Sequence, residues 1–155
     1  MFAPMLACVT NKLSLSVNKR DAQFGVQALA SPWQQKSFRG ADLYFEHGAQ
    51  QATIFLSSQC EKISDSPLEA LTAQLLVGFS EIAIKKQERL KLAEREALIS
   101  SIEAKIDGVP RFLKIMVLRK NRCVFDGVFS SELSQAHLAK DFDSLISGFW
   151  AEAKL

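Results

Sequence analysis

Apolar and polar residues alternate near the start of the chain, which is the pattern of a strand buried on one face. Leu13, Leu15 and Val17 alternate with polar residues and allow a short strand. Apolar residues between positions 23 and 29 support a second strand, in which Gly25 is a candidate bulge. The sequence therefore begins with two segments suited to a half-buried sheet.

Two further strands follow a break at positions 31–33, where a proline precedes a tryptophan. Residues 42–46 and 52–57 are rich in aromatic and β-branched side chains, and the segment 47–50 between them contains a glycine. Strand-forming segments on both sides of a glycine-containing turn are typical of a hairpin. We therefore expect these two segments to pair as antiparallel neighbours.

The clearest helix signal starts at Ser66. A serine at the N-cap, Pro67 at the first helical position and Glu69 three residues after the cap would satisfy free backbone N–H groups from both sides. Apolar residues then recur at helical spacing, at Leu68, Leu71, Leu75, Phe79 and Ile82. This spacing predicts a helix over residues 67–84.

The segment after this helix carries two conflicting patterns. Residues 85–95 are rich in strong helix formers, whereas the apolar residues of 96–106 fit one face of either a helix or a strand. The Asp107-Gly108 pair that follows is a strong hairpin turn, and it needs an antiparallel strand on each side. The turn favours a strand over residues 96–106, while residues 85–95 stay open between helix and strand.

Two more strands and a second helix complete the chain. Residues 112–118 and 123–129 are strand-like and are joined by a tight connection at Lys120-Asn121. Over residues 134–151 the apolar positions form a stripe at helical spacing, with charged residues outside it, which predicts a helix. Trp150, near the end of this helix, is expected to cap the core.

Composition narrows the class of protein. The chain has 155 residues, of which 48% are hydrophobic and 23% charged, as in a soluble globular domain. This length suggests one domain that needs no metal or cofactor to fold. The composition excludes intrinsic disorder, and the lack of a run of about 18 apolar residues excludes a membrane-spanning helix. A net charge of +2, spread along the chain, is not the pattern of a nucleic-acid-binding protein.

The order of elements, roughly β-β-β-α-β-β-β-α, predicts the α+β class, with an antiparallel sheet flanked by helices. Several segments resemble small bacterial secreted proteins or lipoproteins of the PsbP-like fold, an α/β/α sandwich. These segments are Phe24-Gly25-Val26, Pro32-Trp33, residues 41–47, residues 67–71, and the run from 106–110 to 122–126. The resemblance implies a role in binding or assembly and carries over no catalytic residues. We expect a signal-remnant or tether segment over residues 1–20 and a single PsbP-like domain over residues 21–155.

Cys8 ends the segment Pro4-Met5-Leu6-Ala7-Cys8, and a small residue directly before a cysteine resembles the end of a bacterial lipobox. In that motif the cysteine is acylated and becomes the mature N-terminus. The apolar residues before Cys8 resemble the end of a secretory signal whose start lies upstream. The alternative is a short N-terminus with an unmodified surface cysteine.

The other two cysteines, Cys60 and Cys123, match no zinc-binding spacing. Cys60 follows a predicted strand and Cys123 starts one, and in a PsbP-like fold these strand ends could lie close enough for a disulfide. A disulfide needs an oxidising compartment, which agrees with export. The alternative is a pair of buried free thiols in a cytosolic protein.

No motif for catalysis or cofactor binding is present: there is no Walker loop, dinucleotide fingerprint or nucleophile elbow. His47 and His137 lack neighbours at metal-ligand spacing, so we expect no metal and no cofactor. Trp33, after a proline, and Tyr44 are the aromatic residues best suited to a binding surface, although core packing is the more frequent role of aromatic side chains.

The sequence therefore predicts a non-enzymatic binding or assembly protein of the bacterial cell envelope, with a lipid anchor if Cys8 is acylated. We expect a protein partner at the envelope and no nucleic acid. The location would be the periplasm or the membrane surface if the true start lies upstream, and the cytoplasm otherwise. Two alternatives stay open: a cytosolic protein-interaction module, and a small-ligand binder with a pocket between sheet and helix.

Overall fold

The computed structural model describes residues 14–49, 51–60 and 65–154, which form two antiparallel sheets and two α-helices. The strands are β1 (Ser14–Asn18), β2 (Ala22–Gln27), β3 (Trp33–Lys36), β4 (Leu43–His47), β5 (Ala52–Gln59), β6 (Ser80–Leu92), β7 (Arg95–Ile106), β8 (Val109–Lys120), β9 (Cys123–Ser131) and β10 (Trp150–Ala153). The helices are α1 (Leu68–Leu75), the 3-10 helix η1 (Leu133–Leu138) and α2 (Ala139–Ser147).

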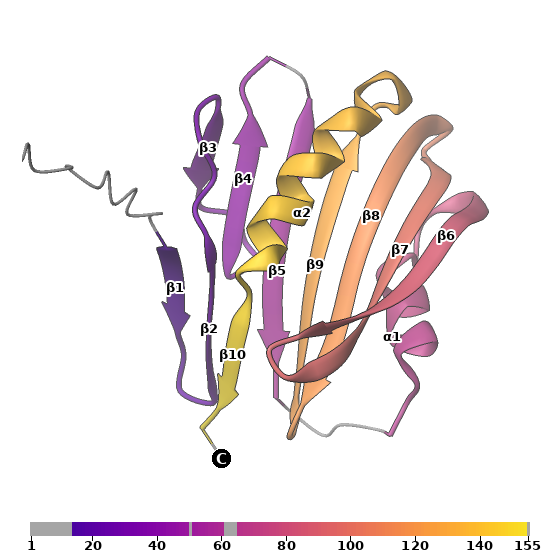
Figure 1. The fold of residues 1–155 in the computed structure, drawn as a ribbon. Coiled ribbons are helices and arrows are strands. Elements are labelled where there is room, and N and C mark those ends of the chain that lie inside the picture. The colour runs from indigo at the N-terminus through magenta and orange to yellow at the C-terminus, as the bar shows by residue number, and fades with distance from the viewer. Residues whose placement is uncertain (1–13, 50, 61–64, 155) are drawn as a thin grey trace, which may run out of the picture.

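The main sheet has seven strands in the order β3-β4-β5-β9-β8-β7-β6, and a small sheet has the order β1-β2-β10 (Figure 1). Every neighbouring pair is antiparallel. α2 and the small sheet cover one face of the main sheet, whereas α1 packs on the other face against β7 and β8. The predicted α+β class is confirmed, with strands, a helix, more strands and a second helix in that order.

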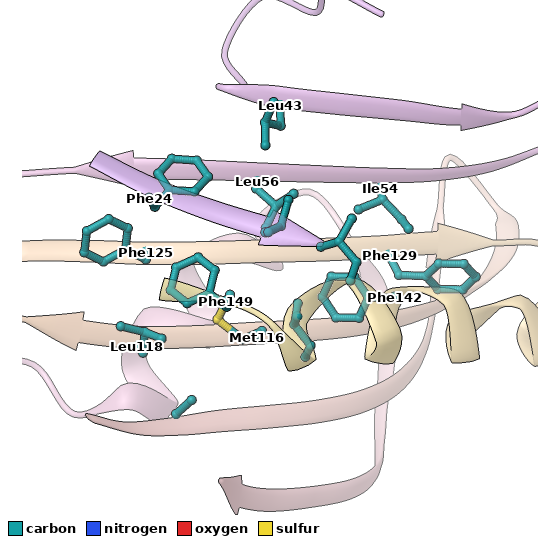
Figure 2. Close-up of a cluster of buried hydrophobic side chains, with 14 of the residues drawn as sticks. Phe24, Leu43, Ile54, Leu56, Met116, Leu118, Phe125, Phe129, Phe142 and Phe149 are labelled. Atoms are coloured by element: carbon teal, nitrogen blue, oxygen red, sulfur yellow. The ribbon is translucent and has the colours of Figure 1, made fainter. Parts of the chain in front are cut away.

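Apolar side chains at alternate positions of the strands form the core on the α2 side of the main sheet. Leu56 of β5 and Phe125 and Phe129 of β9 point to this side and are at most 1% exposed (Figure 2). Phe142 of α2 packs over Gly127, where an added Cβ would lie only 3.3 Å from the ring. The glycine therefore lets the helix approach the sheet, and burial of each large apolar side chain stabilises the fold by about 1.5–3 kcal/mol.

A second apolar cluster lies on the opposite face, beneath α1. Leu98 and Ile102 of β7, Ile115 and Val117 of β8, and Leu68 of α1 are all buried there. The β7 residues are those that the sequence places on one face of a strand, so the strand predicted over residues 96–106 is confirmed.

The helix predicted over residues 67–84 is shorter in the structure. α1 ends at Leu75, the chain turns through Gly78 with a φ of +95°, and β6 follows. Pairing with β7 replaces helical hydrogen bonds along the rest of the segment, because packing in a sheet outweighs a weak local helix propensity. The predicted N-cap is also displaced: Pro67, not Ser66, holds that position, and it makes no side-chain capping hydrogen bond.

The open segment 85–95 is a strand that ends in a tight turn. β6 runs to Leu92 and reverses through Ala93-Glu94, whose φ values are +49° and +63°. The predicted turn at Asp107-Gly108 has the same geometry, with φ values of +50° and +78°. Positive φ costs a residue with a side chain about 1–2 kcal/mol. The pairing of two long strands offsets this cost and overrides the helix propensity of the segment.

The second helix is also shorter than its prediction over residues 134–151. α2 ends at Ser147, and Gly148 and Phe149 separate it from β10, in which Trp150 pairs with Gly25 of β2. The Trp150 indole covers Gly25 so closely that an added Cβ would lie 2.1 Å from Nε1. Trp150 therefore packs β10 onto β2 instead of capping the core, and it stays 38% exposed. The register is continuous at Gly25, so the predicted bulge is wrong.

β1 lies inside the segment 1–20 that the sequence assigns to a signal remnant or tether. It pairs with β2 from Ser14, opposite Gln27, to Asn18, opposite Gln23. Residues 14–18 are thus part of the small sheet.

Candidate functional site

A groove of about 390 Å³ lies on the α2 side of the main sheet, between α2 and the β6–β7 hairpin. Figure 1 shows that the turn end of this hairpin curls across the front of β8 and β9, below α2. β6 and the end of α2 form its walls, and β7 and β8 lie between them.

Four of the nine residues that line the groove are aliphatic. Ile99 of β7 and Ile146 of α2 are buried, and Leu92 of β6 is half-buried. Leu90 of β6 also lines the groove and is 41% exposed, although it is a large apolar side chain. Four aliphatic side chains from three elements therefore meet at one concave surface.

Charged side chains border this apolar surface. Lys114 Nζ of β8 lies 2.7 Å from Asp143 Oδ1 of α2, and the Lys114 side chain is only 16% exposed. The carboxylate offsets the cost of removing this ammonium group from water. Glu88 forms an ion pair with Lys86 at 3.5 Å. Lys91 is the lining cation that forms no ion pair with another described residue.

Trp33, predicted to contribute to a binding surface, opens β3 and is only 8% exposed. Its Nε1 donates a hydrogen bond of 2.9 Å to Asp141 Oδ2 of α2. Its ring packs edge-on against His47, with 5.0 Å between ring centroids, and also contacts Phe129. Trp33 thus connects β3 to α2 within the fold, and little of its side-chain surface is accessible to a partner.

Tyr44, the other aromatic candidate, lies on β4 and on the face opposite α2, since it alternates with the core residue Phe45. Its ring stacks on Phe38 with 4.7 Å between centroids, and Phe38 is 56% exposed. The Tyr44 hydroxyl donates to Glu46 Oε1 at 3.1 Å. Burial first, and then this carboxylate, raise the pKa of Tyr44. Trp33 and Tyr44 therefore belong to opposite faces and form no common site.

The two cysteines at strand ends are joined. Cys60 directly follows β5, Cys123 starts the neighbouring strand β9, and their sulfurs lie 2.15 Å apart in a disulfide. The pairing of Gln59 with Val124 brings these two strand ends side by side. Cys8, the predicted lipidation site, lies outside the described residues.

Asp126 is an acidic residue that the sequence analysis missed. It lies on β9 between Ser57 of β5 and Val117 of β8, on the face that carries α1. Burial raises its pKa from 3.8 to about 7, and the nearby Asp42 adds to the rise. The alternation along residues 123–129 could have identified Asp126, because it places the phenylalanines on one face of the strand and Asp126 on the other.

Metal and membrane features are absent from the described part of the chain. Residues 14–49, 51–60 and 65–154 contain no group of three His, Cys, Asp or Glu side chains placed to hold a metal ion. None of the helices in these ranges is long and apolar enough to cross a membrane.

Comparison with solved structures identifies the fold. CyanoP, the cyanobacterial PsbP of Synechocystis sp. PCC 6803, aligns with a TM-score of 0.59 and 13% identity, over 97% of this chain and 100% of that one. The chain has a PsbP-like fold. LpqN of Mycobacterium tuberculosis, which is involved in cell envelope biogenesis, aligns over 90% of each chain with a TM-score of 0.59 and 11% identity. PA94 of Pseudomonas aeruginosa, a protein of unknown function, aligns over 84% of this chain and 91% of that one, with a TM-score of 0.53 and 12% identity.

These likenesses confirm the resemblance stated from the sequence. No protein-family model and no curated protein sequence matches the chain. At identities of 11–13% the comparison establishes the PsbP-like fold alone. Activity must be argued from the residues of this chain.

Proposed function

We propose that the protein is a non-enzymatic binding or assembly protein that is exported to the bacterial cell envelope. The observation that carries the proposal is the bond between Cys60 and Cys123. Structural disulfides persist in oxidising compartments and are rare in the cytosol, where thiols are kept reduced. The structurally similar LpqN, which is involved in cell envelope biogenesis, supports the same compartment.

The finer form of this proposal places a lipid anchor on Cys8. Ala7 stands directly before Cys8, as the lipobox requires, and acylation of Cys8 would fix the domain to a membrane surface. A lipid anchor suits a binding protein because it concentrates the domain beside its envelope partners. A single acyl chain binds weakly and reversibly, so stable anchoring needs the several chains of a mature lipoprotein.

The test is the intact mass of the native protein, measured without reductant from membrane and soluble fractions. We expect a membrane-bound species that starts at Cys8, carries acyl mass and is lighter by two hydrogens because the disulfide has formed. Cys8→Ser is the matched control, since it should release the protein while leaving the disulfide intact. A soluble native species with three free thiols would overturn the proposal and favour a cytosolic protein-interaction module.

The groove supports a second candidate function, the binding of a small ligand. Its volume of about 390 Å³ falls within the range of about 300–1,000 Å³ that small-molecule sites occupy. Its aliphatic base, formed by Ile99 and Ile146, also matches the apolar lining that is usual for such sites. This candidate is compatible with export, because an envelope protein can bind a ligand in the same compartment.

A further inference from the structure

β6 forms one end of the main sheet, so one of its two backbone edges has no neighbouring strand among the described residues (Figure 1). The strand is 13 residues long, and every residue except Glu88 and Leu92 is exposed. Its N–H and C=O groups on the free edge can therefore pair with another extended chain. β3, at the opposite end of the sheet, has only four residues. β6 is thus the edge of the main sheet best suited to accept a further strand.

Features that discourage such pairing are confined to the first half of β6. The pairing with β7 shifts register twice between Ser80 and Lys86, and such irregularities twist an edge away from a further strand. From Lys86 to Leu92 the register with β7 is continuous. Residues 87–92 therefore form a regular open edge, and the occupant that fits this edge is an extended backbone.

The two faces of this regular span differ in chemistry. Leu90 lies opposite Ala97, on the side of the main core, and is 41% exposed. Arg89 lies opposite Leu98, which belongs to the cluster beneath α1, so Arg89 and the alternate residue Lys91 point to the α1 side. A strand added here would place every second side chain beside an apolar residue and the side chains between them beside cations.

The charge of β6 distinguishes a second copy from an acidic partner. The strand has two acidic residues and four basic ones, so its net charge is +2; the basic residues are Lys85, Lys86, Arg89 and Lys91. The ion pairs that β6 makes with other described residues are exposed, and such pairs contribute little. Pairing β6 with the same strand of a second copy would bring two positively charged strands together, which is unfavourable. An acidic strand avoids this repulsion and complements the charge.

We propose that β6 binds an extended acidic segment of a protein partner, which adds to residues 87–92 as an eighth strand of the main sheet. Acidic side chains of the segment lie beside Arg89 and Lys91, and its alternate apolar side chains lie beside Leu90. The inference rests on the binding function proposed above and names the kind of partner for it. It does not depend on the lipid anchor, on the compartment or on a ligand in the groove.

The probe is a capped heptapeptide in which glutamate alternates with valine, titrated into the isotope-labelled full chain with its disulfide intact. Amide shifts in the NMR spectrum should change along residues 87–92. Hydrogen exchange should slow by about tenfold or more at every second amide of this span, because these N–H groups point away from β7 and become paired. General adhesion of the peptide would not produce this alternation.

Two control peptides separate the role of the backbone from that of the charge. The same peptide with N-methylated amides keeps its side chains but lacks the donors that pair with β6, so it should bind about tenfold more weakly. A peptide with lysine in place of glutamate should also bind about tenfold more weakly, because its charge repels that of β6. Affinity for the glutamate peptide should fall as salt is added, since salt screens exposed charges.

Two matched variants test the position of the partner. Lys91→Glu reverses an exposed charge on β6 and should lower the affinity for the glutamate peptide by about three- to tenfold. Lys140→Glu makes the same change at an exposed residue of α2 and should leave the affinity unchanged. Neither lysine forms an ion pair with another described residue, so both variants should fold.

Each opposite result overturns the inference. Equal binding of the N-methylated peptide, or shifts without slowed exchange at alternate amides of β6, would show that no strand is added. Equal affinities in Lys91→Glu and Lys140→Glu would refute the contact with the cations of β6. Slowed exchange along β6 that appears without peptide as the protein concentration rises would assign the edge to a second copy. If the native protein is a membrane-bound lipoprotein but the peptide does not bind, only this inference falls and the envelope proposal stands.

Discussion

Replacing Asp126 with asparagine tests the energetic cost of holding a half-buried acid in the sheet. Asparagine has nearly the same shape as aspartate but carries no charge, so the substitution removes the ionisation and little else. The pKa of Asp126 is raised from 3.8 to about 7, mainly by burial. A difference of about 3 between the two pKa values corresponds to about 4 kcal/mol, at 1.36 kcal/mol for each pH unit. This is a large part of the 5–15 kcal/mol that stabilises a typical domain.

The sign of the effect follows from proton binding. Between pH 4 and pH 7, approximately, the folded protein retains the Asp126 proton that the unfolded chain has released. The contribution of Asp126 to stability is therefore complete below the lower pKa, decreases across this window, and is constant above the higher pKa. Asp126→Asn should be as stable as the native protein near pH 3.5 and more stable at pH 8, by up to about 4 kcal/mol.

Urea unfolding at a series of pH values, with the disulfide oxidised throughout, measures this difference. The matched control is Asp107→Asn in the exposed β7–β8 turn, where φ is +50° and asparagine is well tolerated. The control should not reproduce the pH-dependent gain. A stability difference between Asp126→Asn and the native protein that does not change from pH 4 to pH 8 would refute the argument. So would an Asp126→Asn variant less stable than the native protein at pH 8.

Three further predictions follow from single contacts. Reduction of the disulfide, which joins residues 63 apart in sequence, should lower the free energy of unfolding by about 4 kcal/mol, measured with and without reductant. Gly25→Ala should lower the free energy of unfolding by about 1–3 kcal/mol, because its Cβ collides with the Trp150 indole. In a double-mutant cycle, adding Trp150→Ala to Gly25→Ala should restore most of that stability. Trp33→Phe removes a hydrogen bond to the α2 carboxylate and should cost about 1.5–3 kcal/mol in urea unfolding, whereas no loss would mean that this bond is not formed in solution.

Local signals were sufficient to predict most strands and their turns. Asp107-Gly108 identified the β7–β8 hairpin because this residue pair accommodates positive φ. The β-branched and aromatic residues of 42–46 and 52–57 likewise predicted the hairpin that β4 and β5 form. These features depend on neighbours within a few residues, so a single sequence contains them.

The ends of both helices could not be predicted in this way. The apolar spacing that extended the first helix to residue 84 continues into β6, where Ile82 is 44% exposed rather than buried. The pairing of β6 with β7 decides the conformation there, and that pairing depends on strands further along the chain. In the same way, the indole of Trp150 is held by Gly25, which lies more than a hundred residues earlier.

The candidate groove exists because most of residues 85–95, for which the sequence favours neither helix nor strand, belong to strand β6. Leu90 and Leu92 lie within residues 85–95, and in β6 they come to line the groove with Ile99 and Ile146. The Ala93-Glu94 turn, formed without glycine, is what closes β6 onto β7 and brings this hairpin towards α2. A helix over the same residues would have satisfied its own backbone and left no strand to form this wall. The β6–β7 hairpin therefore contains both the strained Ala93-Glu94 turn and the exposed apolar side chain of Leu90. This hairpin is the part of the fold where binding should be tested first.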